Sequence, residues 1–425
     1  MLTDSINSTE SSASAGLSPR RVLTILLAAL VALAIPASLA FQLRVAVENG
    51  FSDFQGFYDA ATIIDSGDGA RLYDLSLYDQ PRLKNILKVP GIIVRHYYIH
   101  APFEAIFFLP LARLPFVTAA WVWWTFSLLC AFLTLFVLLP FIASIKERIE
   151  LGLVSVTFFI PTISTLFQGQ DTIVTLLLFA ICYRSLVRGR YTLAGCALAV
   201  AMYKPPLALP MILLLAIVSK ERWKLVTGFL GTFSFLVCVA ILKLGWACVA
   251  GYPSLLSRFS TYEEGHYHLA DMPNVRGLAT LALQHLLSER VIFVVVAVLS
   301  MAVLVLSVWA VKKIKNRPEA HPLVFSLFVA ASVLVGYQEY AYDLALLYLP
   351  VLLTWDSLYQ KDQNSRDRGL LTISTMLLLF GSFLSLAAAP LYACVIVFFF
   401  AVLARQLHGL ACATLVSDRP IEATD

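Results

Sequence analysis

The chain has 425 residues, of which 59% are hydrophobic and 14% charged, and its formal net charge is +4. Soluble domains carry about 25% charged residues, so this chain has more apolar surface than aqueous cores can bury. The small net charge argues against a nucleic-acid-binding surface, and we expect no nucleic-acid partner. The composition therefore predicts an integral, multi-pass membrane protein.

The N-terminal residues 1–19 are rich in Ser and Thr, which predicts a disordered cytoplasmic tail. Arg20 and Arg21 precede an apolar run, Val22–Phe41, that is long enough to span a bilayer. Residues 37–40 are compatible with a signal-peptidase site, but the run exceeds the about 7–15 apolar residues of a signal peptide. We expect an uncleaved first span with a cytoplasmic N-terminus.

Further apolar runs are bounded by charged residues or by Pro and Gly. They cover residues 116–142, 151–167, 171–187, 192–203, 205–219, 224–244, 290–311, 321–336, 343–359, 369–386 and 389–407. The predicted fold is an all-α polytopic bundle of about 12 (11–13) transmembrane helices, the count depending on whether the short run 102–112 crosses or is re-entrant. Helices broken near 168–171 and 204–206 are expected to face a cavity, because lipid does not tolerate polar breaks.

Lys and Arg residues cluster in the connections near 146–148, 184–190, 220–224, 312–317 and 366–368. The positive-inside rule places these connections in the cytoplasm. The others then face outward, and two of them are long, covering about residues 42–97 and 245–289. We expect one transmembrane domain, 20–410, followed by a second cytoplasmic tail, 411–425.

The first outer loop contains a predicted amphipathic helix at the membrane interface. Apolar residues recur there at helical spacing: Phe54, Phe57, Tyr58, Ala61 and Ile64. Asp53 precedes this helix. Its carboxylate either caps the helix or is presented over the mouth of a cavity, and capping would help to position it.

The aromatic turn at 97–103 leads into the short apolar run. Its tyrosines, including Tyr98, are most simply interface anchors. However, His100 and Glu104 lie within one helical turn of each other and would face the same cavity. An ionisable residue such as Glu104 is costly inside an apolar stretch and therefore indicates a function.

Two cations are candidates for binding a phosphate. Lys204 precedes Pro205-Pro206, so its ammonium either snorkels to the headgroups or enters a water-filled pocket. Arg276 lies in the second long loop and is either solvated or a second phosphate ligand. The chain has no Walker A run or GxGxxG fingerprint. A lipid-linked phosphate donor therefore fits better than a nucleotide.

The chain contains a series of short motifs: Asp53-Phe54 with Phe57-Tyr58, Leu72-Tyr73-Asp74, Tyr98 with Pro102-Phe103, Gly169-Gln170, Arg188-Gly189-Arg190, Lys204-Pro205, Glu221-Arg222-Trp223, and Asn274 with Arg276-Gly277. Together, in this order, they resemble glycosyltransferase family 87, of the GT-C superfamily that uses polyprenyl-phosphate sugars. The chain departs from the family pattern at His100-Ala101-Pro102, where paired prolines are usual, and at 340–343, where a Trp-x-His is common.

The resemblance implies a GT-C-type bundle that transfers a sugar, typically mannose, with inversion to an acceptor hydroxyl on the extracytoplasmic face. By this resemblance Asp53 is the general base. We expect Lys204, Arg276 and His100 to bind the donor phosphate. The other pocket candidates are Tyr58, Tyr98, Glu104, Gln170, Asn274, Tyr342 and Asp343.

The expected partners are a polyprenyl-phosphate sugar donor, a glycolipid or glycan acceptor, and the bilayer, here the bacterial inner membrane. No cofactor is expected, and no acidic pair at ligand spacing demands a metal, although a divalent metal stays open. The main alternative is a multispan transporter or flippase for lipid-linked sugars. No repeated broken-helix motif supports it. A structural assembly subunit would leave the outward-facing ionisable residues unexplained.

Overall fold

The computed structural model describes residues 18–49, 52–79, 83, 97–259, 269–312, 314, 320–359 and 365–417. These ranges are helical with short connections and contain no strand, as predicted. The α-helices are α1 (Pro19–Asn49), α2 (Phe54–Asp65), α3 (Pro102–Phe107), α4 (Leu109–Ala112), α5 (Phe116–Leu138), α6 (Ala143–Glu147), α7 (Ile149–Phe158), α8 (Ile160–Gln168), α9 (Thr172–Val187), α10 (Tyr191–Val200), α11 (Pro205–Val218), α12 (Arg222–Leu244), α13 (Trp246–Phe259), α15 (Val275–Leu283), α16 (Glu289–Val311), α17 (His321–Val335), α18 (Tyr348–Tyr359), α19 (Ser365–Phe380), α20 (Leu384–Ala387) and α21 (Ala389–Ser417).

The predicted tails fall mostly outside the described residues. Residues 1–17 and 418–425 are not among them, whereas α21 continues through 411–417.

Six helices are long and apolar enough to cross a membrane. They are Pro19–Val45, Phe116–Phe141, Arg222–Leu244, Glu289–Val311, Asp367–Ala387 and Ala389–Ala411. The α7–α8 pair, bent by 56°, makes a seventh if it is one span. Thr172–Val187, Tyr191–Tyr203, Pro205–Val218 and His321–Val335 are shorter apolar helices. These lengths support an integral membrane protein but do not confirm the predicted count of about twelve crossings.

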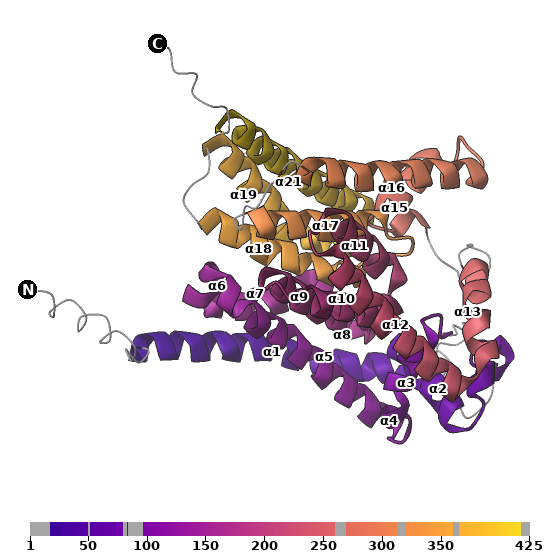
Figure 1. The fold of residues 1–425 in the computed structure, drawn as a ribbon. Coiled ribbons are helices and arrows are strands. Elements are labelled where there is room, and N and C mark those ends of the chain that lie inside the picture. Colours follow the sequence, from indigo (N-terminus) through magenta and orange to yellow (C-terminus); the bar gives the residue numbers. More distant parts are fainter. Residues whose placement is uncertain are drawn as a thin grey trace, which may run out of the picture.

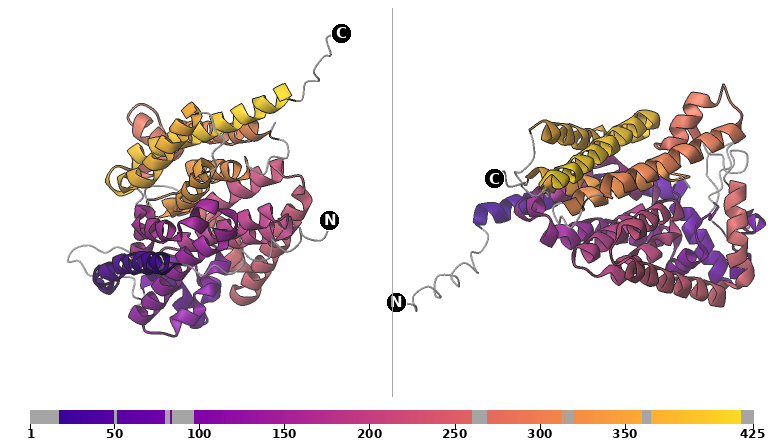
Figure 2. Two further views of the ribbon diagram at one scale, coloured as in Figure 1. Left: turned by 90° about the vertical axis from the view of Figure 1, so that its left-hand side faces the viewer. Right: turned by 45° about the horizontal axis from the view of Figure 1, so that its top comes forward.

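The basic segments near residues 20–21, 146–148 and 184–188 lie together at one end of the helices. Arg21, at the start of α1, donates a 2.9 Å hydrogen bond to the backbone oxygen of Glu147 in α6. The guanidinium of Arg188, just after α9, lies 5.0 Å from the ring centroid of Phe141. Figures 1 and 2 show the start of α1 and the end of α21 toward this end, with α2, α3 and α13 at the opposite end.

Helix α2 forms where the apolar spacing predicts it, but protein covers it. Phe57 stacks on Phe108 between α3 and α4, with ring centroids 4.7 Å apart. Polar residues on the helix are buried as well, since Gln55 and Asp59 are 0% exposed. The helix therefore packs into the protein, against α3 and α4. That it lies on or near the membrane interface stays a prediction.

The short run 102–112 forms two short helices, α3 and α4, which pack against α2. At six and four residues, both are far shorter than a bilayer span.

Helices α10 and α12 cross closely through two glycines. A Cβ added at Gly195 would lie 2.0 Å from the backbone oxygen of Leu225, and one at Gly228 would lie 2.1 Å from that of Thr192. Small residues allow such backbone approach between membrane helices, where dispersion contacts replace the hydrophobic driving force. The crossing supports α10, whose C-terminal end leads to Lys204.

Candidate functional site

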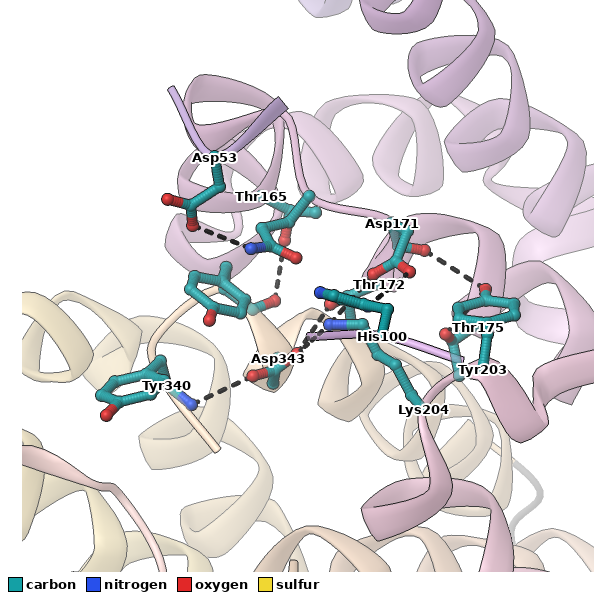
Figure 3. A network of polar contacts seen from close by, with 12 residues as sticks. Asp53, His100, Thr165, Asp171, Thr172, Thr175, Tyr203, Lys204, Tyr340 and Asp343 are labelled. Atoms are coloured by element: carbon teal, nitrogen blue, oxygen red, sulfur yellow. Dashed lines mark hydrogen bonds and ion pairs between the residues drawn. The ribbon is translucent and has the colours of Figure 1, made fainter. Parts of the chain in front are cut away.

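Side chains from segments far apart in the sequence meet in one polar cluster (Figure 3). The segments are the start of α2, the loop before α3, the α8–α9 turn, the α10–α11 break, and the turn before α18. We define the polar cluster as Asp53, His100, Glu104, Gln170, Asp171, Lys204 and Asp343.

The α8–α9 turn is clamped onto the first loop. Gly169 ends α8 in the left-handed conformation (φ 70°), and a Cβ there would lie 2.7 Å from Cβ of Phe54. The Ser52 hydroxyl donates to the backbone oxygen of Gln168 at 3.0 Å, and Trp123 Nε1 donates to that of Gly169 at 2.8 Å. This turn therefore fixes the position of the next residues, Gln170 and Asp171.

Asp53 occupies the N-cap position of α2, but its side chain makes no capping hydrogen bond. Its Oδ2 instead accepts a 2.8 Å hydrogen bond from Nε2 of Gln170. The side chain stays partly exposed. Asp53 and Gln170, both predicted site residues, are thus brought together, and the Asp53 carboxylate is oriented by a side chain from another helix pair.

Lys204 lies at the α10–α11 break, where Pro205 begins the next helix. The residue is 8% exposed, and its Nζ lies 3.0 Å from Oδ1 of Asp171 and 2.5 Å from Oδ1 of Asp343. It also lies 5.2 Å from the ring centroid of Tyr342. The ammonium is therefore held inside the protein and does not snorkel to headgroups.

The turn that carries Asp343 is held in place by hydrogen bonds. Thr172 donates to Oδ1 of Asp343 at 2.9 Å, and the backbone N–H of Tyr340 donates to Oδ2 at 3.1 Å. Thr165 donates to the backbone oxygen of Tyr342 at 2.7 Å. Two predicted pocket residues, Tyr342 and Asp343, thus lie beside Lys204.

His100 and Glu104 face the same group of residues, as predicted from their spacing. His100 Nδ1 lies 3.2 Å from Oε2 of Glu104 and 3.7 Å from Oδ2 of Asp171. The Tyr98 hydroxyl donates to Oε2 of Glu104 at 3.1 Å. Tyr98 is 1% exposed, so it is a buried positioning residue, and the alternative of an interface anchor is corrected.

Arg276 and Asn274 lie at the start of α15, and Arg276 lines a cavity that is described below. Arg276 Nη1 donates to the backbone oxygen of Tyr337 at 2.9 Å, and its guanidinium lies 3.9 Å from that ring's centroid. Burial lowers the pKa of Arg276, although a guanidinium stays charged at neutral pH. Asn274 caps α15 by accepting from the N–H of Gly277 and donates to the backbone oxygen of Gly336.

Two cavities lie near the turn at 337–343, although none of the seven residues of the polar cluster lines either one. The larger, about 970 Å³, is lined by Arg276 and Tyr337 together with apolar residues of α16 such as Ile292 and Phe293. The smaller, about 490 Å³, is lined by Gln168, Tyr340 and Tyr342. Asp271 borders both cavities, so they are neighbours.

Tyr58 has a supporting position. Its hydroxyl donates to the backbone oxygen of Leu114 at 2.8 Å, which ties α2 to the turn before α5.

Asp171 and Glu339 are ionisable residues of this region that were not among the predicted site residues. Asp171 is 2% exposed and pairs with Lys204, while Glu339 is 1% exposed and acts electrostatically on Lys204. Both lie where a short polar segment interrupts an apolar stretch, and this position in the sequence could have identified them as site residues.

Buried ionisable residues that converge beside a cavity, within a helical membrane protein, define a membrane-embedded enzyme or carrier. The sequence profile of glycosyltransferase family 87 matches residues 98–336, more than half of the chain, and the protein belongs to this family. It is therefore a glycosyltransferase. The matched region includes Lys204 and Arg276, whereas Asp53 and Asp343 lie outside it. A search of curated proteins finds no match.

Proposed function

We propose that the protein transfers a hexose, with mannose as the expected sugar, from a polyprenyl-phosphate donor to a hydroxyl of a glycolipid or glycan. Membership of the family supports sugar transfer. The site belongs to a bundle of apolar helices, several of them long enough to span a membrane, and this supports a donor that stays in the bilayer.

In the proposed reaction, the Asp53 carboxylate takes the proton of the acceptor hydroxyl while that oxygen attacks the anomeric carbon. The bond between this carbon and the phosphate oxygen breaks, and the polyprenyl phosphate leaves with the bonding electrons. One carboxylate suffices for a single inversion. The observation that carries this role is the Gln170–Asp53 hydrogen bond, because it orients a partly exposed carboxylate toward the polar cluster. General-base catalysis of this kind contributes about 10²–10⁴-fold.

Fixed positive charge would stabilise the departing phosphate. Arg276 borders a cavity that is lined from Ile292 onward by apolar residues of α16, with Glu289 and Arg290 at the start of that helix. The apolar part suits an isoprenoid chain, and the arginines suit its anionic head. Lys204 is the second proposed phosphate ligand, and a bound phosphate would compete there with Asp171 and Asp343. His100 is less suited, since it lies between two carboxyl groups that would repel a phosphate.

We place the reaction on the extracytoplasmic face of a bacterial inner membrane, with the N-terminus in the cytoplasm. The basic segments near residues 20–21, 146–148 and 184–188, at the end opposite α2 and α3, support this orientation.

The test is whether purified protein in liposomes moves radioactive label from polyprenyl-phosphate mannose to extracted cell lipids or oligosaccharides. The proposal predicts a new labelled product and released polyprenyl phosphate. A transporter or flippase would move the intact donor between leaflets and form no product.

A further inference from the structure

The polar cluster contains three side chains that the proposed transfer reaction leaves without a role. His100 precedes α3, Glu104 lies in its first turn, and Asp171 is at the N-terminus of α9. One donor atom from each lies within 4.8 Å of the other two. We infer that His100, Glu104 and Asp171 bind a divalent transition-metal ion, and we call this group the three-residue site.

An unsatisfied carboxylate oxygen points to a missing ligand. Glu104 is 3% exposed, and Tyr98 and His100 both reach its Oε2. Within the part of the chain that the structure describes, no N–H or O–H group donates to its Oε1, and the neighbour of the Glu104 carboxyl group is the carboxyl group of Asp171, which lies within hydrogen-bond distance. The carboxyl group of Asp171 adjoins that of Glu104 in the same site. Two buried carboxylates repel each other unless a proton or a cation lies between them.

The local charge balance favours a cation. Four buried carboxyl groups surround this region, namely Glu104, Asp171, Glu339 and Asp343. Lys204 contributes one positive charge against them. A buried charge without a partner of opposite sign strongly destabilises the folded protein. A dication would neutralise two of the carboxylates at once.

The geometry favours a metal over a shared proton. A proton needs only two oxygens, whereas here an imidazole nitrogen lies 3.2 Å from one carboxyl group and 3.7 Å from the other. Two ligands on a tetrahedral ion, with bonds of about 2.1 Å, are about 3.4 Å apart. One nitrogen and two carboxylate oxygens suit Mn²⁺, Fe²⁺ or Zn²⁺ better than Mg²⁺ or Ca²⁺, which prefer oxygen ligands.

The surrounding residues orient these three ligands, as second-shell partners do in metal sites. Tyr98 donates to Glu104, and Lys204 pairs with Oδ1 of Asp171, which leaves Oδ2 near His100. The Tyr73 hydroxyl donates to the backbone oxygen of His100 at 2.8 Å. The His100 side chain is 18% exposed, so one ligand of the three-residue site reaches the protein surface.

Binding is tested on the full chain without sugar substrates, so the result is independent of the proposed function. Purified protein in detergent is stripped with EDTA and titrated with MnCl₂, and free Mn²⁺ is measured from its electron paramagnetic resonance signal. We expect about one Mn²⁺ per chain, displaced by an equal concentration of Zn²⁺, which binds such ligands more tightly. Glu104→Gln and Asp171→Asn should each weaken binding by about tenfold or more.

The matched controls are Asp65→Asn and His285→Gln, which change an exposed carboxylate and an exposed imidazole. Both should bind Mn²⁺ as the wild type does. Should the buried variants fail to fold, the wild-type titration decides alone. If no Mn²⁺ binds at about 1 mM, the dissociation constant is too high for a built metal site. That result would overturn the inference and would indicate a proton shared between Glu104 and Asp171. Binding that Glu104→Gln and Asp171→Asn leave unchanged would overturn it equally.

Discussion

Gln170 donates a hydrogen bond to Asp53, while the next residue, Asp171, pairs with Lys204. Two consecutive residues of the α8–α9 turn thus join the carboxylate of the first loop to the lysine of the α10–α11 break. The turn itself is clamped by Ser52 and Trp123. The proposed base and the proposed phosphate ligand therefore belong to one connected polar structure.

The clamp predicts that Gly169→Ala is disruptive. Alanine in the left-handed conformation costs about 1–2 kcal/mol, and here its Cβ would also collide with Phe54. We expect a clearly lower melting temperature and reduced transfer, because Asp53 loses its position against Gln170.

Gly189→Ala is the matched control for this variant. Gly189 has φ 69°, but nothing lies within 4 Å of an added Cβ. Gly189→Ala should lose only the stability that alanine costs in the left-handed conformation, and its rate of sugar transfer should be normal. Equal behaviour of the two variants would argue that the contact with Phe54 does not matter.

Lys204→Met is expected to lower both stability and transfer. Removing one partner of a buried ion pair costs about 3–5 kcal/mol, since Asp171 and Asp343 lose their cation. The double variant Lys204→Met with Asp343→Asn should recover part of the melting temperature by removing one of these charges.

Measuring sugar transfer distinguishes a structural role of Lys204 from a contact with the donor phosphate. If it contacts the donor phosphate, the double variant stays inactive, and Lys204→Ala raises the KM for the lipid donor more than that for the acceptor. Recovery of transfer together with stability in the double variant would instead make Lys204 a purely structural residue.

The orientation is tested by labelling single added cysteines with a membrane-impermeant maleimide, against the wild-type background. Ser66, after α2, and Gly189, after α9, are both exposed. We expect Ser66→Cys to react in cells with an intact inner membrane and Gly189→Cys only after permeabilisation. The reverse pattern would invert the topology, and reaction of both from one side would contradict it.

Long apolar runs made much of the fold predictable. The runs 116–142, 224–244, 290–311 and 389–407 correspond closely to α5, α12, α16 and α21, because a continuous stretch of about 20 apolar residues has few alternatives. The shorter runs did not allow a firm count of crossings. Periodicity also located α2 but not its environment, since an apolar face does not show what covers the opposite face.

The site was predictable where a backbone break accompanied a charge. Lys204 before two prolines and Gln170 after Gly169 stood out for this reason. Their partners were not predictable, because the pairing of Lys204 with Asp171 and Asp343 depends on how three distant turns meet.

Asp53→Asn, compared with Asp65→Asn, tests the central claim most directly. Each variant removes one carboxylate from an end of α2, and the Asp65 carboxylate forms an exposed ion pair with Arg113. With radioactive polyprenyl-phosphate mannose as donor, the account predicts that Asp53→Asn folds normally but loses about 10²–10⁴-fold in transfer, whereas Asp65→Asn retains it. Transfer near the wild-type rate by a folded Asp53→Asn protein would contradict the account.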